Sequence, residues 1–204
     1  KRLYELKHRE SKPGTLIAAN IEQLESLGIK RRYLTAVAQY WPGPVSVIIP
    51  CADPNLAYLH QGKMSLAVRL PKDQSLQDLL IKTGPLLTSS ANLPDQQPAN
   101  TMAEAKNYFG SKIDFYIEGG DLSDHKPSTI IRIIDDAVEV VRGHDHRAGG
   151  VLEGRGEPAA DHVAQHVEDH DVGVLEQVVL LQELHRLADD VAAAAGARRR
   201  PAGL

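Results

Sequence analysis

Short apolar runs alternate with amphipathic segments along the first two thirds of the chain, and this pattern predicts a mixed α/β architecture. A strand is predicted wherever a short apolar run is bounded by turn residues. The predicted strands are Leu3 to Lys7, Thr15 to Ala19, Val45 to Pro50, Ser65 to Leu70, Pro85 to Ser89 and Phe115 to Glu118, followed by a hairpin from Thr129 to Val141 with Asp135 and Asp136 in its turn.

Helix starts are marked by side chains that can accept a hydrogen bond from a free amide of the first turn. Asn20 with Gln23 and Thr101 with Glu104 have this spacing, so each pair predicts a helix that begins there. Two further helices are predicted, from Asp73 to about Lys82 with Gly84 as a stop, and from Arg31 to Tyr40, ended by Trp41-Pro42-Gly43-Pro44.

Composition changes abruptly at Gly143. From there on only Ala, Asp, Glu, Gly, Val, His, Leu, Pro, Gln and Arg occur, and each of them can be encoded by a codon that begins with G or C. Residues 1–142 carry 17 basic and 16 acidic side chains, whereas residues 143–204 carry 6 and 11. We therefore predict one folded domain over residues 1–143 and a compositionally biased tail over residues 144–204. The tail is interpreted as an out-of-frame or antisense translation, with a biased but genuine extension as the alternative.

Two patterns in the tail have a structural interpretation. The segment from Val172 to Ala195 fits an amphipathic helix. His162, His166 and His170 are four residues apart and would form a metal-binding stripe on a helix. Because six of the nine histidines are scattered through the tail, chance spacing is favoured over a metal site.

Length and cysteine content limit the class of protein. A chain of 204 residues with 42% hydrophobic side chains can bury a single core. Its apolar runs are shorter than the roughly 20 residues that span a bilayer, so no membrane segment is predicted. The lone Cys51 has no partner for a disulfide, which favours a reducing compartment and a cytoplasmic location.

Polar groups at the ends of predicted strands are the candidates for chemistry. In Lys7-His8-Arg9 two cations would lie on the same side of an extended segment and could grip a polyphosphate; a solvated basic edge is the alternative. Ser89-Ser90-Ala91-Asn92 places hydroxyl and amide groups where an apolar run opens into a loop, which suits an anion or nucleotide site and equally a turn.

Further cations and hydroxyls bracket other strands. Arg69 closes an apolar run just before Pro71, where a cation must either face solvent or meet an anion. Ser128-Thr129 and Arg142 bracket the last hairpin in the same manner. Trp41-Pro42-Gly43-Pro44 is interpreted as a rigid corner rather than a stacking platform.

Six of these motifs resemble, in order and spacing, those of the YrdC-like threonylcarbamoyl-adenylate synthase family. The family pattern is Lys-x-Arg, Trp-Pro-Gly-Pro, Ala-Val-Arg-x-Pro, Ser-Ala-Asn, Pro-Ser-Thr and a terminal Val-Arg-x-Gly. In this sequence the motifs are Lys7 to Arg9, Trp41 to Pro44, Ala67 to Pro71, Ser90 to Asn92, Pro127 to Thr129 and Val141 to Gly143.

The resemblance implies a YrdC-like twisted mixed sheet flanked by helices, in a single α/β domain. It also implies a nucleotidyltransferase that converts ATP, L-threonine and bicarbonate, with Mg2+, into threonylcarbamoyl-AMP and pyrophosphate for tRNA threonylcarbamoyladenosine modification. The tRNA-modification machinery would be its partner. Catalysis would need no side-chain nucleophile, and the metal ligands stay unassigned. By resemblance, ATP would contact Lys7, Arg9, Ser90, Asn92 and Arg142, and threonine would contact Arg69, Thr88 and Ser128.

The sequence departs from the family pattern at three places. It begins after the usual N-terminal strands that carry a threonine site, Glu10 replaces a proline, and Pro94-Asp95 replaces Ser-Gly. We therefore expect an incomplete family member that makes little threonylcarbamoyl-AMP by itself.

Two other functions compete with this interpretation. The resemblance also implies affinity for double-stranded RNA, so a non-catalytic RNA- or nucleotide-binding module is the main alternative. Lys30-Arg31-Arg32 is a local basic cluster, but a net charge of +1 over residues 1–142 argues against strong RNA binding. An unrelated α/β nucleotide binder is the third interpretation, and it would not need Arg69 and Ser-Ala-Asn to face one cleft.

Overall fold

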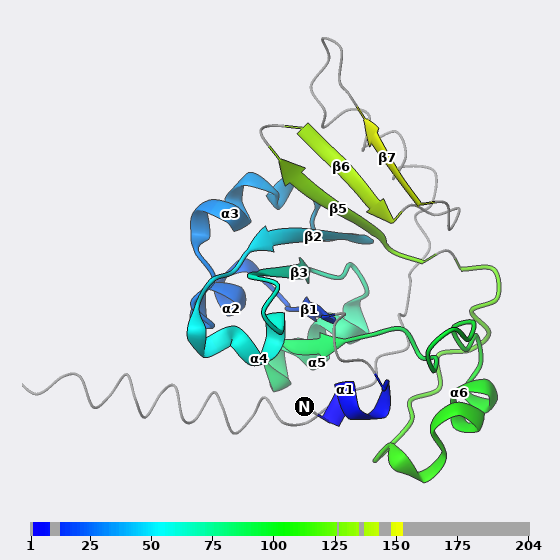
Figure 1. Cartoon of the computed structure of the whole chain (residues 1–204). Coiled ribbons are helices and arrows are strands. Elements are labelled where there is room, and N and C mark those ends of the chain that lie inside the picture. Colours follow the sequence, from blue (N-terminus) through cyan, green and yellow to red (C-terminus); the bar gives the residue numbers. More distant parts are fainter. Residues whose placement is uncertain (1, 9–12, 126, 135–136, 143–147, 153–204) are drawn as a thin grey trace, which may run out of the picture.

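The described part of the chain forms one sheet of seven strands in the order β4-β1-β3-β2-β5-β6-β7 (Figure 1). The computed structural model describes residues 2–8, 13–125, 127–134, 137–142 and 148–152. The β1–β3 and β2–β5 pairs are parallel and the other pairs are antiparallel, so the sheet is mixed as predicted. The strands are β1 (Thr15–Ile17), β2 (Val45–Pro50), β3 (Ser65–Arg69), β4 (Leu86–Thr88), β5 (Thr129–Ile134), β6 (Ala137–Arg142) and β7 (Ala148–Leu152).

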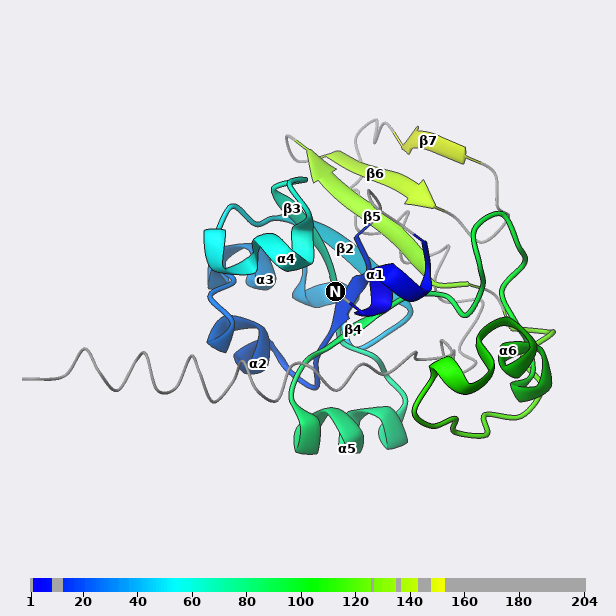
Figure 2. The same cartoon turned by 60° about the horizontal axis from the view of Figure 1, so that its bottom comes forward.

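Helices flank this sheet, and α6 lies on the opposite side of the molecule from α2, α3 and α4 in both views (Figures 1 and 2). Within the described ranges no helix is long and apolar enough to cross a membrane. The α-helices are α1 (Arg2–Leu6), α2 (Ile21–Ser26), α3 (Arg31–Ala36), α4 (Ala57–His60), α5 (Gln74–Thr83) and α6 (Met102–Phe109). Three short 3-10 helices are η1 (Ala38–Tyr40), η2 (Pro54–Leu56) and η3 (Gly110–Lys112).

Three of the four predicted helix starts have side-chain caps, whereas the predicted helix from Arg31 to Tyr40 is divided into α3 and η1 and has no side-chain cap at Lys30. The Asn20 side chain accepts from the Gln23 amide at 2.9 Å, while Gln23 Oε1 accepts from the Ala19 amide at 2.9 Å. Thr101 Oγ1 accepts from the Glu104 amide in the same way. Asp73 caps α5, and Gly84 ends it with a positive φ of 78°, a conformation that glycine adopts without strain.

The two faces of the sheet differ in chemistry, and this difference decides where a site can be. Strand alternation sends Leu16, Val47, Val68, Leu87 and Ile131, which pair with one another, into the large core; we call this the apolar face. The opposite face is called the polar face, and at its centre it carries Thr15, Ser46, Ala67, Arg69 and Thr88. One end of the polar face is covered by α5 through Ile17, Leu76, Leu80 and Leu86.

One predicted strand, Leu3 to Lys7, is wrong, because most of this segment is helix α1. The Lys7 amide donates to the Leu3 carbonyl at 3.0 Å, which is a helical bond. Leu3 is buried in the core, and Tyr4 Oη donates to the Leu59 carbonyl at 3.1 Å. Five residues of mixed polarity fit both the strand period of 2 and the helix period of 3.6, so the sequence pattern does not decide between them. The contacts with α4 favour the helix.

The predicted strand from Phe115 to Glu118 is also wrong, because these residues are irregular. Phe115 and Ile117 are exposed, and Tyr116 Oη donates to the Gly110 carbonyl at 2.7 Å. The segment therefore packs back onto the end of α6 through one ring rather than joining the sheet.

The predicted hairpin is confirmed as β5 and β6, and its turn, Asp135-Asp136, lies outside the described residues. Residues 148–152 form β7, which pairs antiparallel with β6 although it follows the predicted boundary at Gly143. The origin of the tail stays a prediction. The histidine stripe His162, His166 and His170 and the helix from Val172 to Ala195 lie outside the described residues.

Candidate functional site

A buried lysine holds the Ser-Ala-Asn loop in place. Lys7 follows α1 and is 1% exposed. Its Nζ donates to Asn92 Oδ1 at 2.6 Å, to the Ser90 carbonyl at 2.5 Å and to the Asn92 carbonyl. An ammonium group has three hydrogens, so these three oxygens match its donors. The alternative of a solvated basic edge is therefore wrong for Lys7.

The loop after β4 is also braced from within. Ser90 Oγ donates to Asn92 Oδ1 at 2.8 Å, and Asn92 Nδ2 donates to the Gln96 carbonyl at 2.7 Å. The Ala99 amide donates to the Ala91 carbonyl at 2.9 Å and closes the base of the loop. Because both sides of the Asn92 amide group are used, its orientation is fixed, and the loop has one defined shape.

Arg69 and Thr88 share the polar face. Ile17 pairs with Arg69 on one side and with Leu86 on the other, so these three residues form one row across the sheet. Thr88 is two residues beyond Leu86 on the same strand, and alternation sends its side chain to the same face. Thr88 Oγ1 donates to the Thr15 carbonyl at 2.9 Å. Arg69 is 1% exposed and Thr88 is fully buried.

Ser128 reaches the same end of the sheet as Arg69. The Thr129 amide donates to the Pro44 carbonyl at 3.1 Å, and the Gly43 amide donates to the Leu70 carbonyl at 2.9 Å. The starts of β2 and β5 and the end of β3 therefore meet at one edge. Ser128 lies there, buried, one residue before β5.

The remaining predicted site residues are placed only in part. The backbone of Arg142 pairs with Ile130, which sets it near the start of β5, while its side chain lies outside the described residues. Arg9 is also outside the described residues. Ser90 follows Thr88 by two residues but lies beyond the end of β4. Convergence of the loop and Arg69 on one ligand therefore stays a prediction.

Two further residues shape the backbone of this region, and of these Gly14 was not identified from the sequence. A Cβ on Gly14 would lie 2.4 Å from the Thr88 carbonyl oxygen, so only glycine lets the chain enter β1 beside β4. Trp41 Nε1 donates to the Val45 carbonyl at 2.8 Å, which agrees with the interpretation of Trp41 to Pro44 as a corner. A Pro-Gly pair before an apolar run was the available signal for Gly14.

Cys51 does not have the properties of a nucleophile. Its side chain is buried, and desolvation by burial, the largest effect, raises the pKa of the thiol. The neighbouring Asp53 charge acts in the same direction, whereas a hydrogen bond with the Asp53 backbone opposes it. A raised pKa disfavours the reactive thiolate. The thiol is therefore a packing group.

Comparison with known proteins gives consistent matches over the folded part. The family model Sua5_yciO_yrdC, described as "Telomere recombination", matches residues 1–144. The chain is 33% identical over 137 residues to the Threonylcarbamoyl-AMP synthase of Marinobacter nauticus, covering 65% of this chain and 72% of that protein. It is 32% identical over 143 residues to the protein of the same name from Idiomarina loihiensis, covering 67% and 77%.

Solved structures show the same fold. The P. abyssi Sua5 structure complexed with L-threonine is similar with a TM-score of 0.60 and 25% identity, covering 73% of this chain. The match spans 44% of that Sua5 chain, so less than half of it is represented here. E. coli YciO is similar in fold with a TM-score of 0.58 at 23% identity, covering 74% of this chain and 72% of that chain.

Proposed function

Because the chain belongs to the Sua5/YciO/YrdC family, we propose that it is an L-threonylcarbamoyladenylate synthase that uses ATP, L-threonine and bicarbonate. The observation that carries this proposal is the polar face of the sheet, where a buried arginine, Arg69, shares one face with Thr88. At the neighbouring edge of the sheet, the loop of Ser90 and Asn92 is fixed by Lys7. Amino-acid recognition and nucleotide recognition would thus come from adjacent parts of one surface.

Arg69 suits the carboxylate of the amino acid. A guanidinium presents parallel N–H donors that match the two oxygens of a carboxylate, and burial strengthens such a charge-assisted contact. Ser128 supplies a hydroxyl at the same end of the sheet as Arg69, and Thr88 supplies one on the same face, two residues away along the strands. These three residues form the proposed threonine subsite.

The proposed reaction has two bond-forming steps. The amine of threonine adds to bicarbonate with loss of water, which gives a carbamate. A carbamate oxygen then forms a bond to the α-phosphorus of ATP while the bond from that phosphorus to the bridging oxygen breaks, and pyrophosphate leaves with the electron pair. Negative charge gathers on the leaving group, where fixed donors stabilise it. Rate acceleration would come from positioning and would need no side-chain nucleophile, which is compatible with the raised pKa of the Cys51 thiol.

Lys7 has a positioning role in this proposal. Its ammonium group binds oxygens of the loop, so it fixes the groups of Ser90 and Asn92 that would face the nucleotide. Arg9 and Arg142 are the proposed phosphate contacts, since each would add a charge-assisted hydrogen bond.

Magnesium would bind together with the triphosphate of ATP. Among the described residues there is no group of three or more His, Cys, Asp or Glu side chains that could hold a metal ion. Mg2+ commonly binds substrate phosphates and water with few protein ligands, which is compatible with this donor set. When bound, it would neutralise charge on the pyrophosphate. No side chain is assigned to it.

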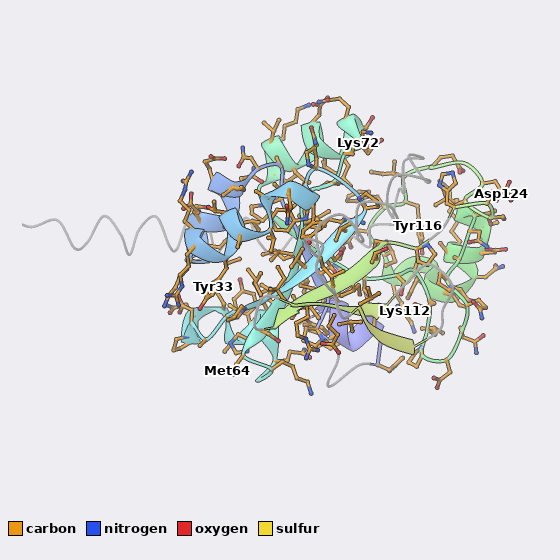
Figure 3. All side chains as sticks on the ribbon, turned by 90° about the horizontal axis from the view of Figure 1, so that it is seen from above. Tyr33, Met64, Lys72, Lys112, Tyr116 and Asp124 are labelled. Carbon is orange, nitrogen blue, oxygen red and sulfur yellow. The ribbon has the colours of Figure 1, made fainter. Side chains whose placement is uncertain are left out.

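RNA binding is the second candidate function, and the basic cluster Lys30-Arg31-Arg32 is the observation behind it. Arg31 already pairs with Glu25 at 2.8 Å, and Arg32 lies over the Tyr33 ring at 4.7 Å from its centroid. In Figure 3 Tyr33 and Asp124 lie on opposite sides of the molecule, so the contact between Arg32 and Tyr33 is far from Asp124. Because Arg31 and Arg32 already have protein partners, we expect RNA binding to be weak. An RNA affinity that falls steeply with salt concentration would instead support RNA binding as a function. Interaction with the tRNA-modification machinery and a cytoplasmic location stay predictions.

The experiment that tests the proposed enzyme follows labelled bicarbonate into threonylcarbamoyl-AMP with ATP and magnesium present. The label must be sensitive enough to detect less than one product molecule per chain. We expect product that requires L-threonine, with pyrophosphate released in equal amount. ATP binding without any threonine-dependent product would favour the nucleotide-binding module.

A further inference from the structure

Ser46 is a buried polar residue near the start of an apolar strand. It lies in β2 between Val45 and Val47, which both point into the large core. Its side chain is 0% exposed, and in the described part of the chain Ser46 Oγ has no hydrogen-bond partner. A buried hydroxyl without a partner is unfavourable, so such a group in a folded protein calls for an explanation.

The register places Ser46 beside the proposed threonine subsite. Val47 pairs with Val68, so continuing this antiparallel register by one residue sets Ser46 opposite Arg69. Ser46 also pairs with Ile130 of β5, two residues after Ser128. Alternation sends the Ser46 side chain to the polar face, because Val45 and Val47 occupy the apolar face. Its hydroxyl therefore lies between the strand that ends in Arg69 and the strand that follows Ser128.

A second buried polar side chain, that of His60, does not share the position of Ser46. His60 Nε2 also lacks a hydrogen-bond partner among the described residues, but His60 belongs to α4, and its Nδ1 accepts from the Gly62 amide at 3.2 Å. His60 is therefore oriented by its own turn and has no strand neighbour on the polar face. Ser46, in contrast, is adjacent in the sheet to a residue of the proposed site.

We propose that Ser46 is a further substrate contact, whose Oγ donates a hydrogen bond to the threonine carboxylate that Arg69 holds. This rests on the proposed function of the site. A carboxylate has about four acceptor positions and a bidentate guanidinium uses two, so a neighbouring hydroxyl donor can be accommodated. Binding would give the hydroxyl the partner that it lacks among the described residues.

The test compares Ser46→Ala with the wild-type chain by thermal unfolding and by titration with L-threonine. The matched control is Ser65→Ala, since Ser65 lies on the same face of neighbouring β3, level with Pro50 and four residues from Arg69. Loss of a hydrogen bond to a charged group predicts about tenfold weaker threonine binding for Ser46→Ala. Ser65→Ala should bind as the wild type does. Ser46→Cys, with a weaker donor of similar shape, should fall between them.

Ligand-free stability gives a second readout that a structural role would not produce. If the hydroxyl has no partner without substrate, Ser46→Ala should unfold at the wild-type temperature or above it, and only the threonine-induced rise should shrink. A lower unfolding temperature with unchanged threonine affinity would overturn the assignment. A wild-type chain with no threonine-dependent shift would contradict the proposed function itself, whereas a full shift retained by Ser46→Ala would contradict only the role of Ser46.

Discussion

At the scale of single residues, Lys7 is a cation whose ammonium group is enclosed by protein oxygens. Replacing it with methionine keeps most of the apolar stem but leaves the Ser90 and Asn92 carbonyls without their donor. Unpaired buried acceptors are costly, so we expect Lys7→Met to lower the free energy of unfolding by about 2–4 kcal/mol. Urea denaturation measures this loss. Lys63→Met, at an exposed position, is the control, and equal stability of both variants would mean that Lys7 does not brace the loop.

Arg69 offers a test of geometry rather than charge. In Arg69→Lys the positive charge is kept while the paired N–H donors are lost, so threonine should bind at least about tenfold more weakly. ATP affinity should stay within about twofold, because Arg69 is assigned to the amino acid alone. Isothermal titration with each ligand separates the two effects. The control is Arg132→Lys on β5, an exposed arginine paired with Glu139 at 3.7 Å. Weakened ATP binding with normal threonine binding would reverse the assignment.

At the scale of elements, the packing of β1 against β4 depends on Gly14. An alanine Cβ there would meet the Thr88 carbonyl at 2.4 Å, and a backbone atom cannot turn aside as a flexible side chain can. We expect Gly14→Ala to destabilise the fold by about 1–3 kcal/mol through overpacking. Gly62→Ala provides the contrast, because it meets nothing within 4 Å and is limited only by its φ of 77°. Chemical denaturation of both variants separates crowding from backbone strain, and an unchanged Gly14→Ala would show that β4 can shift.

Arg2 of helix α1 forms an ion pair with Asp114 in the segment after η3, and the contribution of this ion pair to stability depends on pH. Arg2 Nη1 and Nη2 donate to Asp114 Oδ2 and Oδ1 at 2.6 and 2.9 Å, and chiefly this hydrogen bonding lowers the pKa of the Asp114 carboxyl below its usual value. A lowered folded-state pKa gives stability that is present above the unfolded pKa and lost as pH falls through the folded one. The gap in unfolding temperature between wild type and Asp114→Asn should therefore be seen at pH 5–7 and close below about pH 4. A gap that persists in acid would exclude the ion pair as its cause.

The elements that could be predicted from the sequence are those with local causes. Asn20 and Thr101 cap helices through bonds that span three residues, so spacing alone was sufficient. The segment from Leu3 to Lys7 was misassigned because its helix is selected by contacts with Leu59, which is more than fifty residues away. No local pattern carries that information.

For the candidate site, the sequence identified residue types but not their arrangement. That Arg69 and Thr88 share a face follows from the register of β1 with both β3 and β4, and register depends on pairing between distant segments. The same holds for Ser46, which in the sequence is one polar residue within an apolar run. Its burial, and its lack of a partner among the described residues, become visible only when the whole sheet is assembled.

At the scale of the whole molecule, the proposed nucleotide site draws on three separate parts of the chain. The loop of Ser90 and Asn92 follows β4, Arg9 follows α1, and the backbone of Arg142 lies in β6 beside Ile130 of β5. Groups supplied by separate elements contribute to binding independently when they share no partner. If Arg9 and Arg142 each contact a phosphate, their effects on ATP affinity should add.

We expect Arg9→Ala and Arg142→Ala each to weaken magnesium-dependent ATP binding about tenfold, since a charge-assisted phosphate contact is worth roughly 1.5–3 kcal/mol. The double variant should then weaken binding about a hundredfold, and each substitution should flatten the dependence of affinity on salt, because phosphate contacts by cations are screened. Isothermal titration at two salt concentrations measures both. Lys112→Ala, which removes an exposed cation beyond α6, is the control for the loss of general positive charge. Wild-type affinity in both single variants would remove these arginines from the nucleotide site, and a double variant no weaker than either single one would mean that they grip the same phosphate.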